Sequence, residues 1–157
     1  MDELYDQILG ILTRIELDMT PDPENMRIFF QWGSADIFVG VFDAGGGNRY
    51  ASVRSCLLSD VRLGAPTKLL DALAAINSAN QKTVTSKFVV DYEVDDLDKP
   101  ASIWTEFYIP ANVLSADSFV EAVGDVADDA DNWDDELKNL LGSGETAEDR
   151  YRDDVEV

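Results

Sequence analysis

The sequence contains no histidine among its 157 residues, and this absence excludes much of the chemistry that proteins perform near neutral pH. Without an imidazole, the Ser–His and Cys–His pairs of nucleophilic catalysis cannot form. The one cysteine, Cys56, falls in the middle of a predicted strand, where we expect a small packed side chain and not a reactive thiol. We therefore predict a protein that is not an enzyme and that needs no cofactor.

Other absences bear on location. A single cysteine cannot form a disulfide within the chain, which suits a reducing compartment. The start of the sequence, Met1–Asp2–Glu3, lacks the basic residues of a signal peptide. No apolar run approaches the roughly 20 residues that span a bilayer. We expect a cytoplasmic protein without a membrane segment.

Positive charge is scarce, since 12 Lys and Arg stand against 32 Asp and Glu for a net charge of −20. A field of this sign repels phosphate backbones and anionic lipids, so it disfavours nucleic acids and membranes as partners and favours basic proteins. A surplus of acids over lysine also occurs in proteins of salt-adapted cells. The charge alone therefore has two interpretations, a binding surface or an adaptation to the surrounding salt.

The first half of the chain combines one helical pattern with three strand patterns. Apolar residues at helical spacing predict a helix over residues 2–18, which Pro21 and Pro23 end in a loop. Alternating and aromatic residues then predict three strands joined by short turns that contain glycine. These strands cover residues 27–32, 36–42 and 49–58.

The second half repeats the alternation of helix and strand. Leu69, Leu70, Leu73 and Ile76 form the predicted apolar stripe of a second helix. A third helix can begin after Ser115 and end at Gly142. The remaining tail is acidic, and we expect it to be mobile or loosely docked. The predicted elements are a helix at 66–79, strands at 83–94 and 102–109, a helix at 116–141 and a tail at 142–157.

These elements predict an α+β fold with the order α-β-β-β-α-β-β-α. Short connections between strands favour a five-stranded antiparallel sheet, with the helices packed mainly on one face. One domain would cover residues 1–141, with residues 142–157 as an acidic tail.

The second predicted helix carries a pattern with a known counterpart. Its sequence over residues 68–80, KLLDALAAINSAN, ends in the pair Asn77 and Asn80, and the strand at 87–91 follows. Together with the acidic last helix around Trp133, this resembles the YbjN family of bacterial proteins, whose domain is similar to type III secretion chaperones. The order of elements agrees from about residue 4 to residue 141. The resemblance implies a chaperone-like or regulatory protein, often dimeric, with no catalytic residues to carry over.

Acidic residues on the last predicted helix form one candidate site. Asp128, Asp131 and Asp135 share a face at spacings of three and four residues, where like charges repel. Such a face is usually solvated, and it can also attract a basic partner. Clustered carboxylates could hold a divalent cation, although the spacing of a calcium-binding loop is missing.

Aromatic residues on the last predicted strand form a second candidate. Trp104 and Tyr108 share the face opposite Ile103 and Phe107. If helices cover only one face of the sheet, this pair lies on the open face, where it could bind a second copy or a client protein. Packing within a core is the alternative.

We therefore predict a protein-binding module that uses an open sheet face and the acidic last helix. Its partner would be a protein client of basic character, and the module itself would be a homodimer. Two alternatives stay open. The first is an acidic mimic of nucleic acid that inhibits a DNA-binding protein, and the second is a metal-dependent hydrolase that uses clustered carboxylates.

Overall fold

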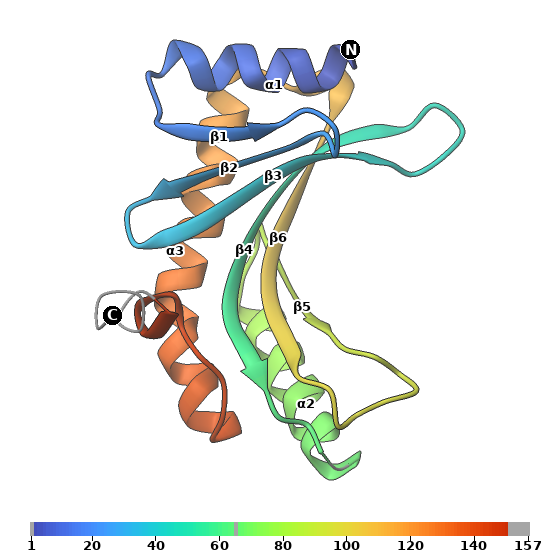
Figure 1. The fold of residues 1–157 in the computed structure, drawn as a ribbon, viewed down its shortest axis with the longest axis vertical. Coiled ribbons are helices and arrows are strands. Elements are labelled where there is room, and N and C mark those ends of the chain that lie inside the picture. The colour runs from blue at the N-terminus through green and yellow to red at the C-terminus, as the bar shows by residue number, and fades with distance from the viewer. Residues whose placement is uncertain (1, 65, 151–157) are drawn as a thin grey trace.

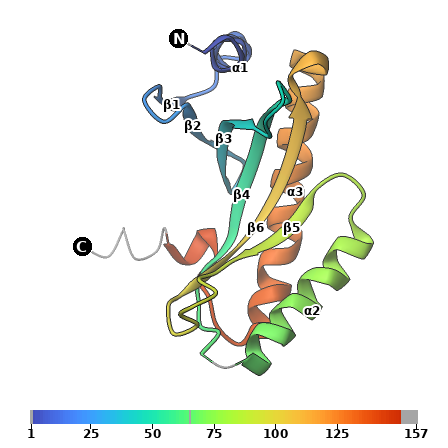
Figure 2. The ribbon, with the colours of Figure 1, turned by 90° about the vertical axis from the view of Figure 1, so that its right-hand side faces the viewer.

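The computed structural model describes residues 2–64 and 66–150, which form one antiparallel sheet of six strands flanked by helices (Figures 1 and 2). Along the sheet the strands follow the order β1-β2-β3-β4-β6-β5, and every neighbouring pair is antiparallel. The strand bounds are β1 Met19–Asp22, β2 Arg27–Trp32, β3 Ala35–Asp43, β4 Arg49–Val61, β5 Lys87–Asp91 and β6 Ala101–Pro110.

Three α-helices and one short 3₁₀ helix complete the fold. The helix bounds are α1 Glu3–Arg14, α2 Pro66–Lys82, η1 Ala111–Val113 and α3 Ala116–Leu141. Asp2 caps α1 by accepting hydrogen bonds from the backbone N–H groups of Leu4 and Tyr5. Ser115 caps α3 as predicted, and Gly142 ends it with φ of 65°, a left-handed conformation that glycine adopts without strain.

The buried side chains of the three α-helices and of one sheet face form a single hydrophobic core. Each helix contributes one stripe, and strands contribute alternate residues, as the pleat requires. Among the largest of these buried side chains are Tyr5, Phe30, Phe88 and Phe119. The helices therefore cover one face of the sheet, and the arrangement agrees with the predicted α+β class.

The prediction of five strands is wrong, because residues 19–22 form an additional strand, β1. Pro21 and Pro23 indicated a loop, but β1 lies at the edge of the sheet, where a proline without an N–H group removes no necessary ladder bond. In the register of the pair, Pro21 lies opposite Ile28 of β2. The helix α1 also ends at Arg14, four residues earlier than predicted, which leaves room for the connection to β1.

The strand predicted over residues 83–94 is shortened to β5, Lys87–Asp91. Val84 and Val94, which fall within the predicted strand, lie beyond the ends of β5 and are 92% and 76% exposed. The stripe of α2 is also rotated from the prediction. Ala72, Ile76 and Ala79 are buried, whereas Leu70 and Leu73 are exposed. Small residues thus form much of the contact surface of this helix, together with Ile76 and Leu69, a choice that hydrophobicity alone does not reveal.

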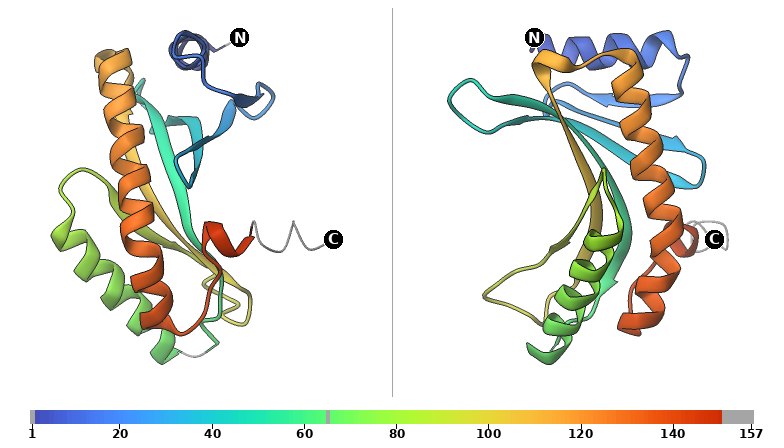
Figure 3. Two further views of the ribbon diagram at one scale, coloured as in Figure 1. Left: turned by 90° about the vertical axis from the view of Figure 1, so that its left-hand side faces the viewer. Right: turned by 180° about the vertical axis from the view of Figure 1, so that it is seen from behind.

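Residues 143–150 of the predicted acidic tail contact the edge of β4. Ser59 of β4 and Glu145 exchange backbone hydrogen bonds of 3.0 and 2.8 Å. Gly144, with φ of 113°, passes so close to β4 that an added Cβ would lie 3.2 Å from Val61. The segment runs from the end of α3 along the edge of β4 (Figure 3), and Asp149 remains paired with Lys138 of α3. Residues 151–157 lie outside the described part of the chain.

Candidate protein-binding surface

The face of the sheet that the helices leave uncovered carries a group of aromatic side chains, which we call the aromatic face. They arise from alternate positions on β2, β3, β4 and β6, directed away from the core. The residues of the aromatic face are Phe29, Phe38, Phe42, Tyr50, Trp104 and Tyr108. Phe38, Phe42 and Tyr108 are 37%, 47% and 38% exposed, so much of their ring surface contacts solvent.

The six rings form two contacting clusters. In the first, Phe38 lies between Phe29 and Trp104, with ring centroids 5.2 and 5.5 Å apart. In the second, Phe42 contacts Tyr108 at 5.3 Å and Tyr50 at 6.3 Å. Tilted and edge-on contacts at these distances stabilise aromatic pairs beyond their burial. The contacts hold each ring in place while leaving one side of the cluster open.

Arg54 of β4 and Glu106 of β6 lie between the two clusters, opposite each other in the register. The guanidinium carbon of Arg54 stands 4.7 Å from the ring centroid of Trp104, a cation–π contact. Its Nε lies 3.3 Å from a carboxylate oxygen of Glu106, without the alignment of a hydrogen bond. Tyr108 donates a hydrogen bond of 3.1 Å to the same carboxylate. Burial, with the nearby charge of Glu106, raises the pKa of Tyr108, so its hydroxyl stays protonated.

The predicted placement of Trp104 and Tyr108 on the face opposite Ile103 is confirmed, since Ile103 is fully buried while Trp104 is half-buried and Tyr108 is exposed. The sequence reasoning did not assign Phe38 and Phe42 to this surface. The signal was available in β3, where both alternate against the apolar residues that face the core. Whether the surface binds a partner stays a prediction.

The docked tail forms one border of the aromatic face. Arg150 donates hydrogen bonds to the carbonyl oxygen of Cys56 and to the hydroxyl of Ser59, at 3.2 Å each. Its guanidinium also lies 3.8 Å from a carboxylate oxygen of Asp36. Cys56 is half-buried beside these groups, and burial raises the pKa of its thiol, which agrees with an unreactive cysteine.

The three predicted acidic residues of α3 are exposed, but the structure brings only two of them into one site. Asp131 and Asp135 line a cavity of about 210 Å³ at the C-terminal half of the helix, whereas Asp128 does not. Asp131 accepts a hydrogen bond of 2.7 Å from Ser34 in the β2–β3 turn. Because α3 packs on the helix-covered face, the sheet separates these carboxylates from Trp104 and Tyr108.

Two further carboxylates on α3 are held in less polar surroundings than those that sequence reasoning selected. Burial raises the pKa of Asp134, which also lines the cavity, and neighbouring acidic residues add to that effect. Burial likewise raises the pKa of Asp129, although Ser86 donates a hydrogen bond to it. In residues 2–64 and 66–150, no group of three acidic or thiol side chains converges as a metal site would require.

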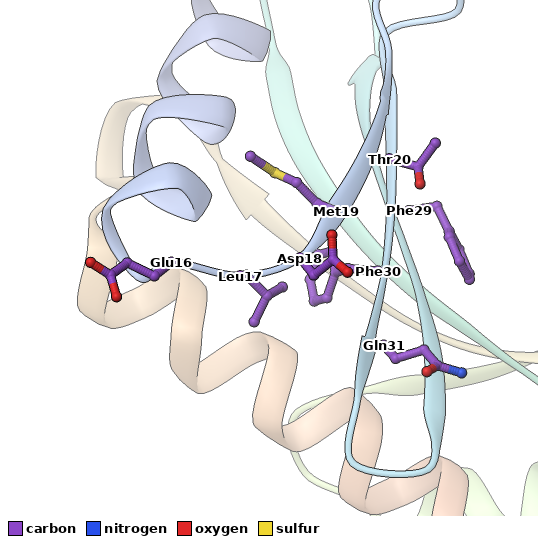
Figure 4. Close-up of a pocket in the computed structure, with 8 residues that line it drawn as sticks. All are labelled: Glu16, Leu17, Asp18, Met19, Thr20, Phe29, Phe30 and Gln31. Atoms are coloured by element: carbon purple, nitrogen blue, oxygen red, sulfur yellow. The ribbon is translucent and has the colours of Figure 1, made fainter.

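A larger cavity, of about 340 Å³, lies beside the edge strand β1 (Figure 4). Residues of the α1–β1 connection and of β1 and β2 line it, and Phe29 and Phe30 point to opposite sides of β2. Its polar lining residues, Glu16, Asp18, Thr20 and Gln31, are all exposed. The cavity therefore offers a small ligand little of the enclosed polar contact that fixes orientation in a binding site.

No helix within the described residues combines the length and the apolar composition that crossing a membrane demands.

Comparison with known proteins supports the fold. No family model matches the chain, and no curated protein sequence matches it. Among solved structures, the chain is similar to YbjN from E. coli, a proposed transcription regulator, with a TM-score of 0.58 and 11% sequence identity. The match covers 84% of this chain and 92% of the other. The fold is therefore YbjN-like, in agreement with the resemblance of the sequence.

Proposed function

We propose that this protein is a non-enzymatic binding module whose aromatic face binds a basic protein partner. The observation that carries the proposal is the group of six aromatic side chains on the uncovered face of the sheet, three of them more than a third exposed. Aromatic side chains are enriched at the centres of protein interfaces, because they bury a large area at low cost in side-chain entropy. A regulatory role agrees with the YbjN-like fold.

The charge of the chain supports the choice of partner. With a net charge of −20, the surface attracts basic proteins and accelerates their association at low salt. Two copies of this chain would repel each other under the same conditions. Salt should therefore weaken binding of a basic partner and strengthen a homodimer. Sedimentation velocity at low and high salt tests the predicted homodimer separately.

A photoreactive phenylalanine analogue at position 42 provides the test of the surface. Proteins that cross-link to it in a native cell extract are identified by mass spectrometry, and the main partner is purified and titrated. The variant Phe38→Ser/Phe42→Ser removes one ring from each aromatic cluster, and we expect it to weaken binding at least about tenfold. The matched control is Leu70→Ser/Val94→Ser, which removes two exposed apolar side chains elsewhere.

An affinity that is equal in the wild type and in the Phe38→Ser/Phe42→Ser variant would overturn the proposal. A loss of affinity shared by the control variant would also contradict it, because general surface hydrophobicity would then explain binding. Circular dichroism and the unfolding midpoint of each variant establish that its fold is intact before its affinity is compared.

A further inference from the structure

The strand β6 has a free edge beyond the end of β5. On one side β6 pairs with β4 as far as Pro110, but on the other side β5 pairs only with residues 102–106. Residues 107–110 therefore have no strand partner on that side within the described chain. A strand edge of this kind presents unpaired N–H and C=O groups that can pair with another extended segment.

A cavity of about 340 Å³ lies beside this free edge, and we call it the β6 groove. It is lined by residues of β6, η1, the first half of α3 and the loop before β5. Its lining includes the apolar side chains of Phe107, Ile109, Val113 and Ala122, and Tyr108 and Pro110 complete the part that β6 contributes. Val113 is 59% exposed, so the groove is open at η1. Its volume falls within the range of sites that enclose small molecules or a few side chains, about 300–1,000 Å³.

Two carboxylates, Glu121 and Asp125, complete the lining of the β6 groove. They are one helical turn apart on α3, where like charges repel each other. Neither of them forms an ion pair with any residue in the described part of the chain. A cationic side chain placed between them would offset this repulsion and form an attractive charge interaction with each carboxylate.

We propose that the β6 groove binds an extended segment of a partner protein, which adds a strand to β6 and directs apolar and basic side chains into the groove. Backbone pairing with residues 107–110 would provide affinity that does not depend on sequence. Alternate side chains of the added strand would then enter the groove, one against Phe107 and Ile109 and the next between Glu121 and Asp125. The net charge of −20 excludes an acidic segment on electrostatic grounds.

The groove and the aromatic face meet at Tyr108, which lines both, but they use opposite sides of β6: Phe107 and Ile109 point to the helix-covered side, and Tyr108 points to the other. The proposal therefore does not depend on the proposed function. The variants that test each site share no residue, and failure of one proposal leaves the other in place.

Capped peptides with an alternating sequence provide the probe. The binding peptide repeats threonine-valine-threonine-lysine, so that valine and lysine share one face of the strand. A second peptide replaces lysine by glutamate, and a third carries methyl groups on its backbone nitrogens, which removes the donors for pairing with β6. Titration calorimetry with the full chain should show saturable binding of the first peptide only.

Charge variants separate the groove from general attraction to an acidic protein. We expect Glu121→Gln/Asp125→Asn to weaken the affinity for the lysine peptide by about fivefold or more. The control Asp95→Asn/Asp98→Asn removes the same charge from the β5–β6 turn and should leave affinity within about twofold. An equal loss of affinity in both variants would overturn the proposal. Undiminished binding of the methylated peptide would also overturn it, as would the absence of saturable binding of the lysine peptide at millimolar concentration. Amide exchange within residues 107–109, slowed by the lysine peptide, would locate the pairing directly, since Pro110 has no N–H group.

Discussion

The two faces of the sheet carry aromatic side chains of similar size and use them differently. On the helix-covered face, Phe30 and Phe88 are each 2% exposed, whereas on the open face Phe38 and Phe42 are 37% and 47% exposed. On the covered face the rings belong to the core that the three helices complete, and Phe88 contacts Trp133 of α3. On the open face the rings contact mainly one another. The comparison shows that an apolar side chain on a strand stabilises the fold only as far as another layer covers it.

The largest change in stability is expected when one phenylalanine is replaced on each face of the sheet. Phe30→Ala should lower the free energy of unfolding by about 3–5 kcal/mol, because it leaves a cavity in the core. Phe42→Ala should lower it by about 1 kcal/mol or less, because the ring is half in solvent and loses only its ring contacts. Urea unfolding measures both variants. Similar losses would show that the open face contributes to stability as the core does, and the comparison between the faces would fail.

An intermediate effect is expected at the junction of α2 and β5 on the covered side. The side-chain amide of Asn80 accepts a hydrogen bond of 2.7 Å from the N–H of Phe88 and donates one of 3.0 Å to its carbonyl oxygen. Asn80→Ala leaves both buried backbone groups without a partner and should cost about 1–3 kcal/mol. Asn77→Ala is the control, since Asn77 is exposed, and should change stability by about 0.5 kcal/mol or less. Equal losses of stability in the two variants would mean that the hydrogen bonds of Asn80 do not stabilise the position of β5.

The smallest change in stability is expected in the docked tail, residues 143–150, which borders the open face. Hydrogen bonds from Lys138 and from Thr146 lower the pKa of Asp149 to about 2. A carboxyl whose pKa is lowered by folding stabilises the protein above its ordinary pKa near 4 and ceases to do so as the pH falls towards 2. Asp149→Asn should therefore reduce stability at pH 7 by less than about 1 kcal/mol, given the partly exposed position.

Thermal unfolding at several pH values measures this effect. The difference in midpoint between the wild type and Asp149→Asn should shrink between about pH 4 and pH 2. Asp128→Asn removes the same charge from an exposed position and controls for the change in net charge. A difference that does not change with pH would show that the carboxylate of Asp149 does not hold the tail through its charge.

Much of the fold could be predicted because its signals are local. The strand over residues 27–32 and the helix over residues 116–141 have the predicted bounds, since strand alternation, the Ser115 cap and the Gly142 terminator act through neighbouring residues. The strand β1 could not be predicted in the same way. Pro21 is compatible with a strand only at a sheet edge, and the position of a strand within a sheet depends on residues distant in sequence.

The candidate surface was predicted only in part for a related reason. The alternation of β6 placed Trp104 and Tyr108 together on one face, and the structure agrees. The alternation of β3 was equally clear, but whether Phe38 and Phe42 are covered depends on where the helices pack. The spacing of the three acidic residues predicted a shared helical face, but the cavity formed with Ser34 and residues 146–148 is lined by Asp131 and Asp135 and not by Asp128.

The amino-acid sequence by itself determined the alternation of helices and strands, the residues on each face of a strand, and the absence of imidazole chemistry, because each follows from composition or from spacing along the chain. Only the tertiary structure decided which sheet face the helices cover, that residues 143–150 dock beside Cys56 and Ser59 on β4, and that β6 extends past β5 beside two carboxylates. These features depend on contacts between segments far apart in the chain, and the free energy of such contacts is not encoded in any local pattern.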